Sequence, residues 1–383
     1  MTRKKKILAA AWHPGAANAI SPVIKKLIQE DWVEVLVVAH EFSEKIFDNF
    51  QITYQTLAQY GFVEASPESI SELLKQEKPD LVLVGTSSQQ SEKSKFVIEQ
   101  SVNISAKKLG IKSLAVLDFW MGYVRRFSDV FTGERFKYLP DKIAIMDETA
   151  REEMLKEGFD DNLLVITGNP YFDDLPQKAA DFSETDKATI RQKIGLAADF
   201  LMFFASSSFK NNQKVCGYWD LKIIKIIAET MDSLPTDKKQ KTGLVLRLHP
   251  RTPEADRNEI EEYLKKFPEN RIKIVKDISS QELILASDLA LTPDSTVAVE
   301  SVYLGKPCLS LQPGLKIKDE LIVSRKGIIP AGYSENDCRN LLAKAIQDKE
   351  FLRGILEKEA TFRTDGQATK RVINLVYEML GKI

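Results

Sequence analysis

The sequence feature that most restricts which fold this chain can adopt is a regular alternation of short apolar runs with longer segments of helical periodicity. The runs 33–39 and 80–86 are almost continuously apolar, as expected for strands buried on both faces of a sheet. Segment 17–30 instead repeats its apolar residues every three to four positions, which places them on one face of a helix. Strands that alternate with helices in this way are typical of parallel sheets covered by helices. The sequence therefore predicts an α/β fold.

Two such series follow one another along the chain. They are separated by Gly168-Asn169-Pro170 and by weakly periodic sequence that extends to residue 184. The length of 383 residues agrees with two domains of roughly 150 residues each. We expect two doubly wound Rossmann-like domains facing each other across a cleft. The predicted parts are an N-terminal Rossmann-like domain at 1–168, a linker at 169–184, a C-terminal Rossmann-like domain at 185–365, and a final helix at 366–383 that packs back on the N-terminal domain.

Apolar periodicity also predicts the individual elements. The expected strands are 6–11, 33–39, 80–86, 112–117, 142–146 and 163–167 in the first series, and 199–205, 243–248, 271–275, 288–291 and 307–311 in the second. The main expected helices are 17–30, 92–109, 185–194, 335–347, 349–359 and 368–380.

The amino-acid composition limits which classes of partner this chain can bind. Lys and Arg number 54 against 55 Asp and Glu, so the chain lacks the excess of positive charge that binding nucleic acid through counterion release requires. No run approaches the roughly 20 apolar residues of a membrane-spanning helix. The basic tail Arg3–Lys6 is expected to be solvated, with contact to an anionic membrane surface as the alternative. We expect a cytoplasmic protein, either free or peripheral at the inner face of a membrane.

Cysteine and histidine usage gives no sign of a metal or a disulfide framework. The three cysteines, Cys216, Cys308 and Cys338, have no metal-type spacing, and they agree with a reducing compartment. The three histidines are far apart in the sequence. We therefore expect no metal and no cofactor.

Two loops of the N-terminal half carry candidate catalytic residues. In doubly wound sheets, ligands bind beyond the carboxyl ends of the strands, where the strand order reverses. His13 directly follows the first strand and could act as a general base; the alternative is a surface histidine in a turn. Asp118, followed by Phe119 and Trp120, could act as a base or hold a substrate hydroxyl. The alternative there is a turn residue beside two core aromatics.

In the C-terminal half, His249 stands at a strand end between Arg247 and Arg251. The arginines favour an anion, and Pro250 keeps His249 out of helical geometry, so the sequence favours a phosphate contact. The alternative is a buried structural histidine.

A second cluster in this half contains Ser295 and Thr296, which open a helix where the amides of Thr296 and Val297 are expected to be free for an anion. Glu300 lies one turn further and could reach a ribose; the alternative is an ordinary helix cap. Ser206 and Ser207 are expected to add donors at the same edge of the sheet.

The C-terminal half resembles the nucleotide-binding element of GT-B fold enzymes. The likeness is carried by Asp288 to Pro307, with three further motifs in the same order: Thr167 to Pro170, Leu248-His249-Pro250, and Asp365 to Arg371. It is similar above all to the non-hydrolysing UDP-N-acetylglucosamine 2-epimerases and the CDP-glycerol glycerophosphotransferases. The resemblance covers residues 160–380 and extends to the N-terminal half only in architecture. It implies a GT-B type fold.

The resemblance also implies a nucleoside diphosphate of the UDP or CDP type, with its phosphates on Ser295, Thr296 and His249 and its ribose on Glu300. A glycan or lipid-linked acceptor would enter through the N-terminal, acceptor-side domain, where His13 or Asp118 would deprotonate it.

Two features depart from the epimerase pattern. Serines 206–208 replace a histidine-arginine pair, and Thr296-Val297 replaces a pair of glycines. The sequence therefore favours a transferase that uses a nucleotide-activated sugar or polyol phosphate in cell-surface glycan synthesis. The alternatives are a 2-epimerase-like isomerase and a catalytically inactive GT-B binding module.

Overall fold

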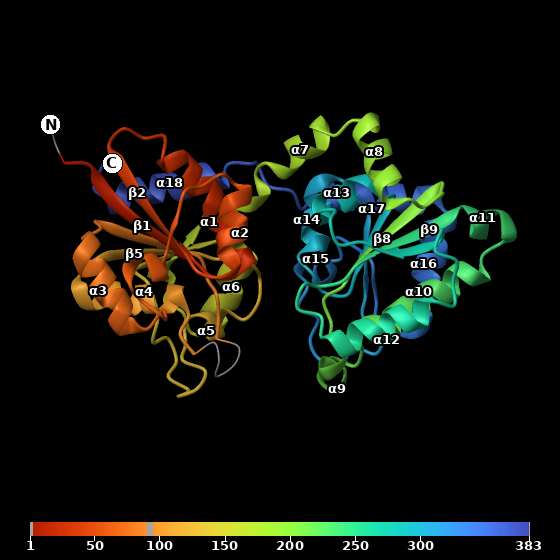
Figure 1. Ribbon diagram of the computed structural model, residues 1–383, viewed down its shortest axis with the longest axis horizontal. Helices are drawn as coiled ribbons and strands as arrows, with labels where there is room; N and C mark the ends of the chain where they lie inside the picture. The colour runs from red at the N-terminus through yellow and green to blue at the C-terminus, as the bar shows by residue number, and fades with distance from the viewer. Residues whose placement is uncertain (1–2, 90–94, 383) are drawn as a thin grey trace. The chain divides into compact units, whose positions relative to one another are not determined.

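Parallel strands form both sheets of the chain, and each sheet has helices on its two faces (Figure 1). The computed structural model describes residues 3–89 and 95–382. They form unit 1, Met1–Asp173 with Thr364–Ile383, and unit 2, Asp174–Arg363. The predicted class of two doubly wound, Rossmann-like α/β domains is confirmed.

The sheet of unit 1 has the strand order β3-β2-β1-β4-β5-β6-β7. The order reverses between β1 and β4, which pair in parallel with Ile7 opposite Leu81. Ligands of doubly wound folds bind at the carboxyl end of such a reversal. The strands are β1 Lys5–Ala11, β2 Val33–Ala39, β3 Gln55–Thr56, β4 Leu81–Val84, β5 Lys112–Val116, β6 Lys142–Ile145 and β7 Leu164–Ile166.

The helices of unit 1 include several that periodicity did not predict. Helices α2 and α6 are short and mostly polar, so few apolar positions repeat within them, whereas α3 has Ile70, Leu73 and Leu74 at helical spacing. The predicted start of α4 at Glu92 lies outside the described residues. The helices are α1 Pro14–Leu27, α2 Phe42–Asn49, α3 Pro67–Glu77, α4 Ile98–Leu109, α5 Tyr123–Arg126, α6 Glu148–Lys156 and α18 Ala368–Met379, with short 3-10 turns η1 Leu57–Tyr60, η3 Asp161–Leu163 and η4 Pro170–Phe172.

The sheet of unit 2 has the order β10-β9-β8-β11-β12-β13, with its reversal between β8 and β11. Its strands are β8 Phe200–Ala205, β9 Thr242–Arg247, β10 Ile272–Ile274, β11 Leu289–Thr292, β12 Cys308–Leu311 and β13 Ala331–Gly332. Its helices are α7 Leu175–Asp181, α8 Glu184–Ile194, α9 Gln213–Cys216, α10 Asp220–Ser233, α11 Thr236–Lys241, α12 Glu254–Leu264, α13 Ser280–Ala286, α14 Val297–Leu304, α15 Ile322–Arg325, α16 Glu335–Gln347 and α17 Lys349–Ala360, with the 3-10 turn η5 Lys210–Asn212.

The segment expected to be a linker, 169–184, is structured. Residues 170–172 form η4 in unit 1, and α7 packs against α14 in unit 2. Helix α7 has only seven residues, too few for an apolar period to be visible in the sequence.

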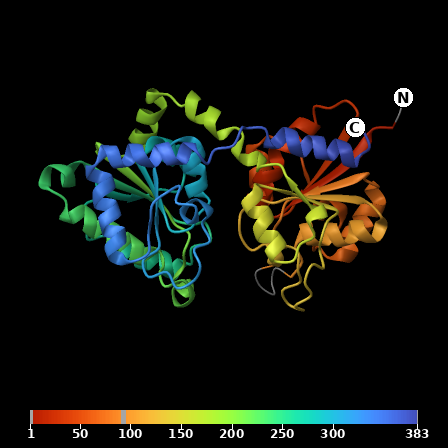
Figure 2. The same ribbon diagram turned by 180° about the vertical axis from the view of Figure 1, so that it is seen from behind.

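The final helix, α18, lies in unit 1 and packs against α1 (Figure 2). The amides of Ala368 and Thr369 donate to the Asp173 carboxylate over 3.1 and 2.7 Å, which satisfies free donors at the start of the helix. The Arg371 guanidinium donates to the Thr167 carbonyl over 2.7 Å. Val372 and Val376 are fully buried in the core that α1 shares with the sheet. These contacts return the end of the chain to unit 1.

Within the described residues, no helix is both long and apolar enough to span a membrane.

A buried acid lies in the core of unit 2. Glu359, on α17, is 0% exposed, and its Oε1 accepts a hydrogen bond of 3.2 Å from the Cys308 amide. Its Oε2 has no hydrogen-bond partner among the described residues. Burial raises the pKa of Glu359 to about 8. The folded protein therefore keeps a proton that the unfolded chain loses above the ordinary value of 4.5.

We predict that Glu359→Gln makes the protein less sensitive to alkaline pH. The stability of the wild type should fall as the pH rises from the unfolded pKa to the folded pKa, because charging the buried carboxyl is costly. Near pH 9, the variant should be more stable than the wild type by about 1–3 kcal/mol in urea unfolding, and near pH 5 the two should be similar. The control is Glu357→Gln, an exposed position on the same helix, which should keep the wild-type pH dependence. Equal pH dependence of Glu359→Gln and wild type would contradict the prediction.

Candidate functional site

The structure brings the predicted residues His13 and Asp118 to one edge of unit 1. They follow β1 and β5, which flank β4, so all three carboxyl ends meet where the strand order reverses. The His13 amide donates to Ser87 Oγ over 3.1 Å, and Thr86 Oγ1 donates to Asp118 Oδ1 over 3.1 Å. Thr86 and Ser87 follow β4, so they connect the two predicted loops.

Gly15 makes this arrangement possible. A Cβ at residue 15 would lie 2.3 Å from Asp118 Oδ2, far inside van der Waals contact. Gly85, at the end of β4, is packed as closely on the other side of the loop, where a Cβ would lie 2.5 Å from the Ala16 side chain. Within unit 1, the space beside Gly15 is therefore used by the carboxylate of Asp118.

Asp118 is held by several groups. Its Oδ1 forms an ion pair with Arg126, from α5, and its main-chain carbonyl accepts from Asn169 Nδ2 over 3.0 Å. The two aromatics that follow it belong to the core. Trp120 is buried, stacks on Phe172 at 6.3 Å, and donates to Asp147 over 3.0 Å.

His13 is partly exposed and stacks on Trp12, with 4.2 Å between the ring centroids. It stands at the N-cap position of α1, where its side chain forms no capping hydrogen bond. The Trp12 indole donates to Glu41 over 2.8 Å, which fixes the ring that supports the histidine. The imidazole is thus oriented by stacking.

Sequence reasoning missed Glu99, which lies beneath these loops in the first turn of α4. Its Oε1 accepts from the Trp12 amide over 2.9 Å and from Ser87 Oγ over 2.6 Å. Burial raises its pKa to about 7. The sequence offers little signal for it, because residues 97–102 read Val-Ile-Glu-Gln-Ser-Val and the glutamate stands beside two other polar residues.

In unit 2, the predicted serines lie at the reversal between β8 and β11. Ser206 Oγ donates to Asp220, and the amides of Ser207 and Ser208 donate to Asp220 Oδ1 over 3.3 and 3.1 Å. Ser207 Oγ donates to Asp294 Oδ1. The hydroxyl protons expected to serve a ligand are thus engaged within the protein. Burial raises the pKa of Asp220 to about 7.

The loop between β11 and α14 contains the other predicted cluster. Burial raises the pKa of the Asp294 carboxyl, which accepts from Tyr218 OH over 3.2 Å. The Val297 amide donates to Ser295 Oγ over 3.3 Å, so the expectation of a free amide there was wrong. The short side chain of Ser295 can bend back to the amide two residues ahead. Glu300 is buried in the first turn of α14.

His249 lies at the end of β9, next to β8. Its Nδ1 accepts from the Arg251 amide over 3.0 Å, which assigns the proton of the neutral ring to Nε2. Burial, together with the positive charge of Arg251, lowers its pKa to about 4. The neutral imidazole can therefore donate one hydrogen bond to an anion at neutral pH. Arg247 donates instead to the Ile278 carbonyl over 2.8 Å.

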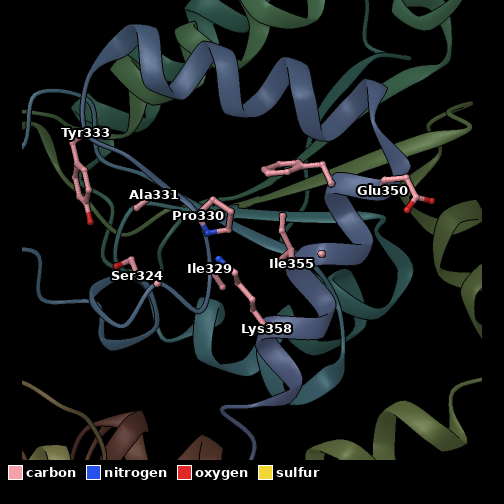
Figure 3. A pocket seen from close by; sticks show the side chains of 11 residues that line it. Ser324, Ile329, Pro330, Ala331, Tyr333, Glu350, Ile355 and Lys358 are labelled. Atoms are coloured by element: carbon pink, nitrogen blue, oxygen red, sulfur yellow. The ribbon is translucent and has the colours of Figure 1, made fainter.

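A cavity of about 630 Å³ lies elsewhere in unit 2, between α15, β13 and α17 (Figure 3). One wall of the cavity is apolar and is formed by Ile329, Pro330 and Ile355, and the amine of Lys358 is also part of the lining. No predicted site residue is among those that line it. Among the described residues, no group of three or more His, Cys, Asp or Glu side chains could hold a metal.

Two parallel, doubly wound sheets define a protein with the two-domain, Rossmann-like fold of the GT-B type. The family model of UDP-N-acetylglucosamine 2-epimerase matches residues 141–377, which is more than half of the chain. The chain belongs to that family.

A curated relative, the UDP-N-acetylglucosamine 2-epimerase of Methanococcus maripaludis, is 23% identical over 324 residues, or 80% of this chain and 78% of the relative. Two solved structures share the fold. The S. aureus MnaA co-structure with UDP has a TM-score of 0.73 at 18% identity, and the match covers 99% of this chain and 98% of the MnaA chain. The Neisseria meningitidis UDP-GlcNAc 2-epimerase bound to UDP-GlcNAc has a TM-score of 0.69 at 17% identity, and the match covers 99% of this chain and 100% of the Neisseria chain.

These comparisons correct the expected activity. The chain is an enzyme of the epimerase family, and the prediction of a glycosyltransferase or glycerophosphotransferase was wrong. The resemblance to the epimerases is confirmed, whereas nothing supports the likeness to CDP-glycerol transferases. The transferase was preferred because serines 206–208 and Thr296-Val297 depart from the epimerase pattern, and these two local departures do not exclude the family.

We predict that Gly15→Ala destabilises the protein by about 1–3 kcal/mol, because the new methyl group would overlap the Asp118 carboxylate. In an Asp118→Ala background the overlap is absent, so the same change should cost much less. Urea unfolding of the four proteins would give the coupling energy, expected to be about 1–2 kcal/mol. Additive effects would show that the two residues are not in contact.

Proposed function

We propose that this chain interconverts UDP-N-acetylglucosamine and its C2 epimer, UDP-N-acetylmannosamine. The observation that carries the proposal is the family match over residues 141–377. Polar loops at the β1–β4 and β8–β11 reversals support it, because such positions bind ligands in doubly wound folds.

We assign UDP to the carboxyl edge of the sheet in unit 2. His249 would donate its Nε2 proton to a phosphate oxygen, and its low pKa keeps it neutral during turnover. The Ser295 and Thr296 hydroxyls stand at the start of α14, where the helix dipole favours an anion. Glu300, one turn on, would accept from the ribose hydroxyls. In this assignment Ser295 and Thr296 contact the phosphates, which is the role that the sequence predicts for them.

Epimerisation breaks the C2–H bond on one face of the sugar and forms a C2–H bond on the other. The reaction has no net redox change and uses no acceptor. One group must take the proton and another must supply one. We assign these steps to the two catalytic residues predicted in unit 1, Asp118 and His13. Asp118 is already oriented by Thr86 and Arg126, as a group that moves a proton must be.

The proposal predicts that the protein, incubated with UDP-N-acetylglucosamine in D₂O, produces the epimer and places deuterium at C2 of the sugar. Asp118→Asn should lower the exchange rate by at least about 100-fold, since it removes a general acid–base group. His249→Ala should weaken UDP binding by about 10- to 100-fold, the loss of one hydrogen bond to a charged group. NMR of the sugar and calorimetry with UDP measure the two effects.

His40→Ala is the matched control for UDP binding, because it removes a histidine of unit 1 and should leave the affinity for UDP unchanged. UDP binding without any deuterium exchange would contradict the epimerase and favour a non-catalytic binding module. The engagement of Ser206 and Ser207 with internal carboxylates is the feature that favours this second candidate. An absence of UDP binding would contradict both functions.

A further inference from the structure

A buried carboxyl that the proposed reaction does not use lies under the catalytic edge of unit 1. Glu99 is 2% exposed. Its Oε1 accepts two hydrogen bonds, from the Trp12 amide over 2.9 Å and from Ser87 Oγ over 2.6 Å. Ser87 Oγ in turn accepts from the His13 amide over 3.1 Å. One carboxylate oxygen thus ties the loop after β1 to the loop after β4, across the reversal of strand order.

The second oxygen of Glu99 has different surroundings. Oε2 is buried and has no hydrogen-bond partner among the described residues. Leaving a buried carboxylate oxygen charged and without a hydrogen-bond partner costs free energy, and protonation of that oxygen removes the charge. The carboxyl therefore has one oxygen engaged in positioning and one oxygen available for protonation.

The charged groups around Glu99 come from neighbouring elements. Asp118, after β5, repels the ionised form and raises its pKa further. Arg126 of α5 is engaged by Asp118. Glu41 accepts from the Trp12 indole, and His13 stacks on the same ring. Burial remains the largest cause, and with it the pKa of Glu99 is raised to about 7.

We propose that Glu99 is a positioning residue whose protonation state sets how firmly the His13 loop is held. The ionised carboxylate is a strong acceptor for the Trp12 amide and the Ser87 hydroxyl, and protonation weakens both bonds because a neutral acid accepts less strongly. The loop that carries His13 is then held firmly above neutral pH and loosely below it. The effect on catalysis rests on the proposed function, whereas the coupling of Glu99 to the loop does not.

Trp12 allows this coupling to be measured without substrate. Its main-chain amide bonds to Glu99 and its indole to Glu41, so one residue reports both acids. The chain has four tryptophans, so selective ¹⁵N-tryptophan labelling gives few signals, and Trp12→Phe assigns those of Trp12. In the wild type, the Trp12 amide signal should titrate with a midpoint near pH 7. In Glu99→Gln, which keeps an acceptor oxygen but cannot ionise, this titration should disappear.

Glu41→Gln is the matched control: it should change the Trp12 indole signal and leave the amide titration in place. Ser87→Ala keeps Glu99 and serves if Glu99→Gln does not fold; the amide titration should persist in it. A wild-type Trp12 amide that does not titrate near neutral pH would overturn the proposal. So would an amide that titrates equally in Glu99→Gln.

A catalytic readout extends the test. In the deuterium-exchange assay, Glu99→Gln should lose the part of the kcat pH profile that has its midpoint near 7, with KM unchanged within about 3-fold because UDP is assigned to unit 2. A wild-type profile in Glu99→Gln would overturn the positioning role. If the wild type shows no exchange at all, the proposed function fails, and the Trp12 titration still decides whether Glu99 is coupled to the loop.

Discussion

The pairing of β1 with β4 in one sheet, and of β8 with β11 in the other, is the constraint on which the candidate sites depend. At each of these pairs the chain leaves neighbouring strands toward opposite sides of the sheet, so the loops diverge and polar groups collect at the edge between them. In unit 1 these groups are His13, Ser87 and Asp118. In unit 2 they are Ser207 and Asp294. Close packing around Gly15 and Gly85 then determines how near the loops of unit 1 can approach.

A buried carboxyl supports the loops at both reversals. Glu99 in unit 1 and Asp220 in unit 2 each stand in the first turn of a helix and accept hydrogen bonds from a strand-end loop. Burial raises both pKa values to about 7. Burying an acid costs stability unless hydrogen bonds compensate, so each carboxyl is retained together with the loop amides and hydroxyls that bind it. In both units, a buried carboxyl at the start of a helix thus holds the loop that follows a strand, although Glu99 and Asp220 are far apart in the sequence.

The sequence predicted the fold well and the activity poorly. Strands buried on both faces are continuous apolar runs, and all eleven predicted strands, from 6–11 to 307–311, agree with the observed strands to within two residues at either end. Short polar helices such as α2 and α7 have too few apolar positions to be seen. The transferase prediction was wrong because two local departures from the epimerase pattern, at serines 206–208 and Thr296-Val297, outweighed the resemblance to the epimerases, whereas the family model identifies the epimerase family. Site roles for His13, Asp118, His249 and Glu300 remain predictions.

By itself, the amino-acid sequence determined two helix-covered parallel sheets and the strand ends at which polar residues stand, because apolar periodicity and breaks in it are local properties. Only the tertiary structure decided which polar atoms are already engaged. It pairs Asp118 with Arg126, and it turns Ser206 toward a buried acid. It also places Glu99 under residues 12 and 87. The residues joined by these contacts stand 8 to 87 positions apart in different elements, and no local pattern in the sequence specifies such a partner.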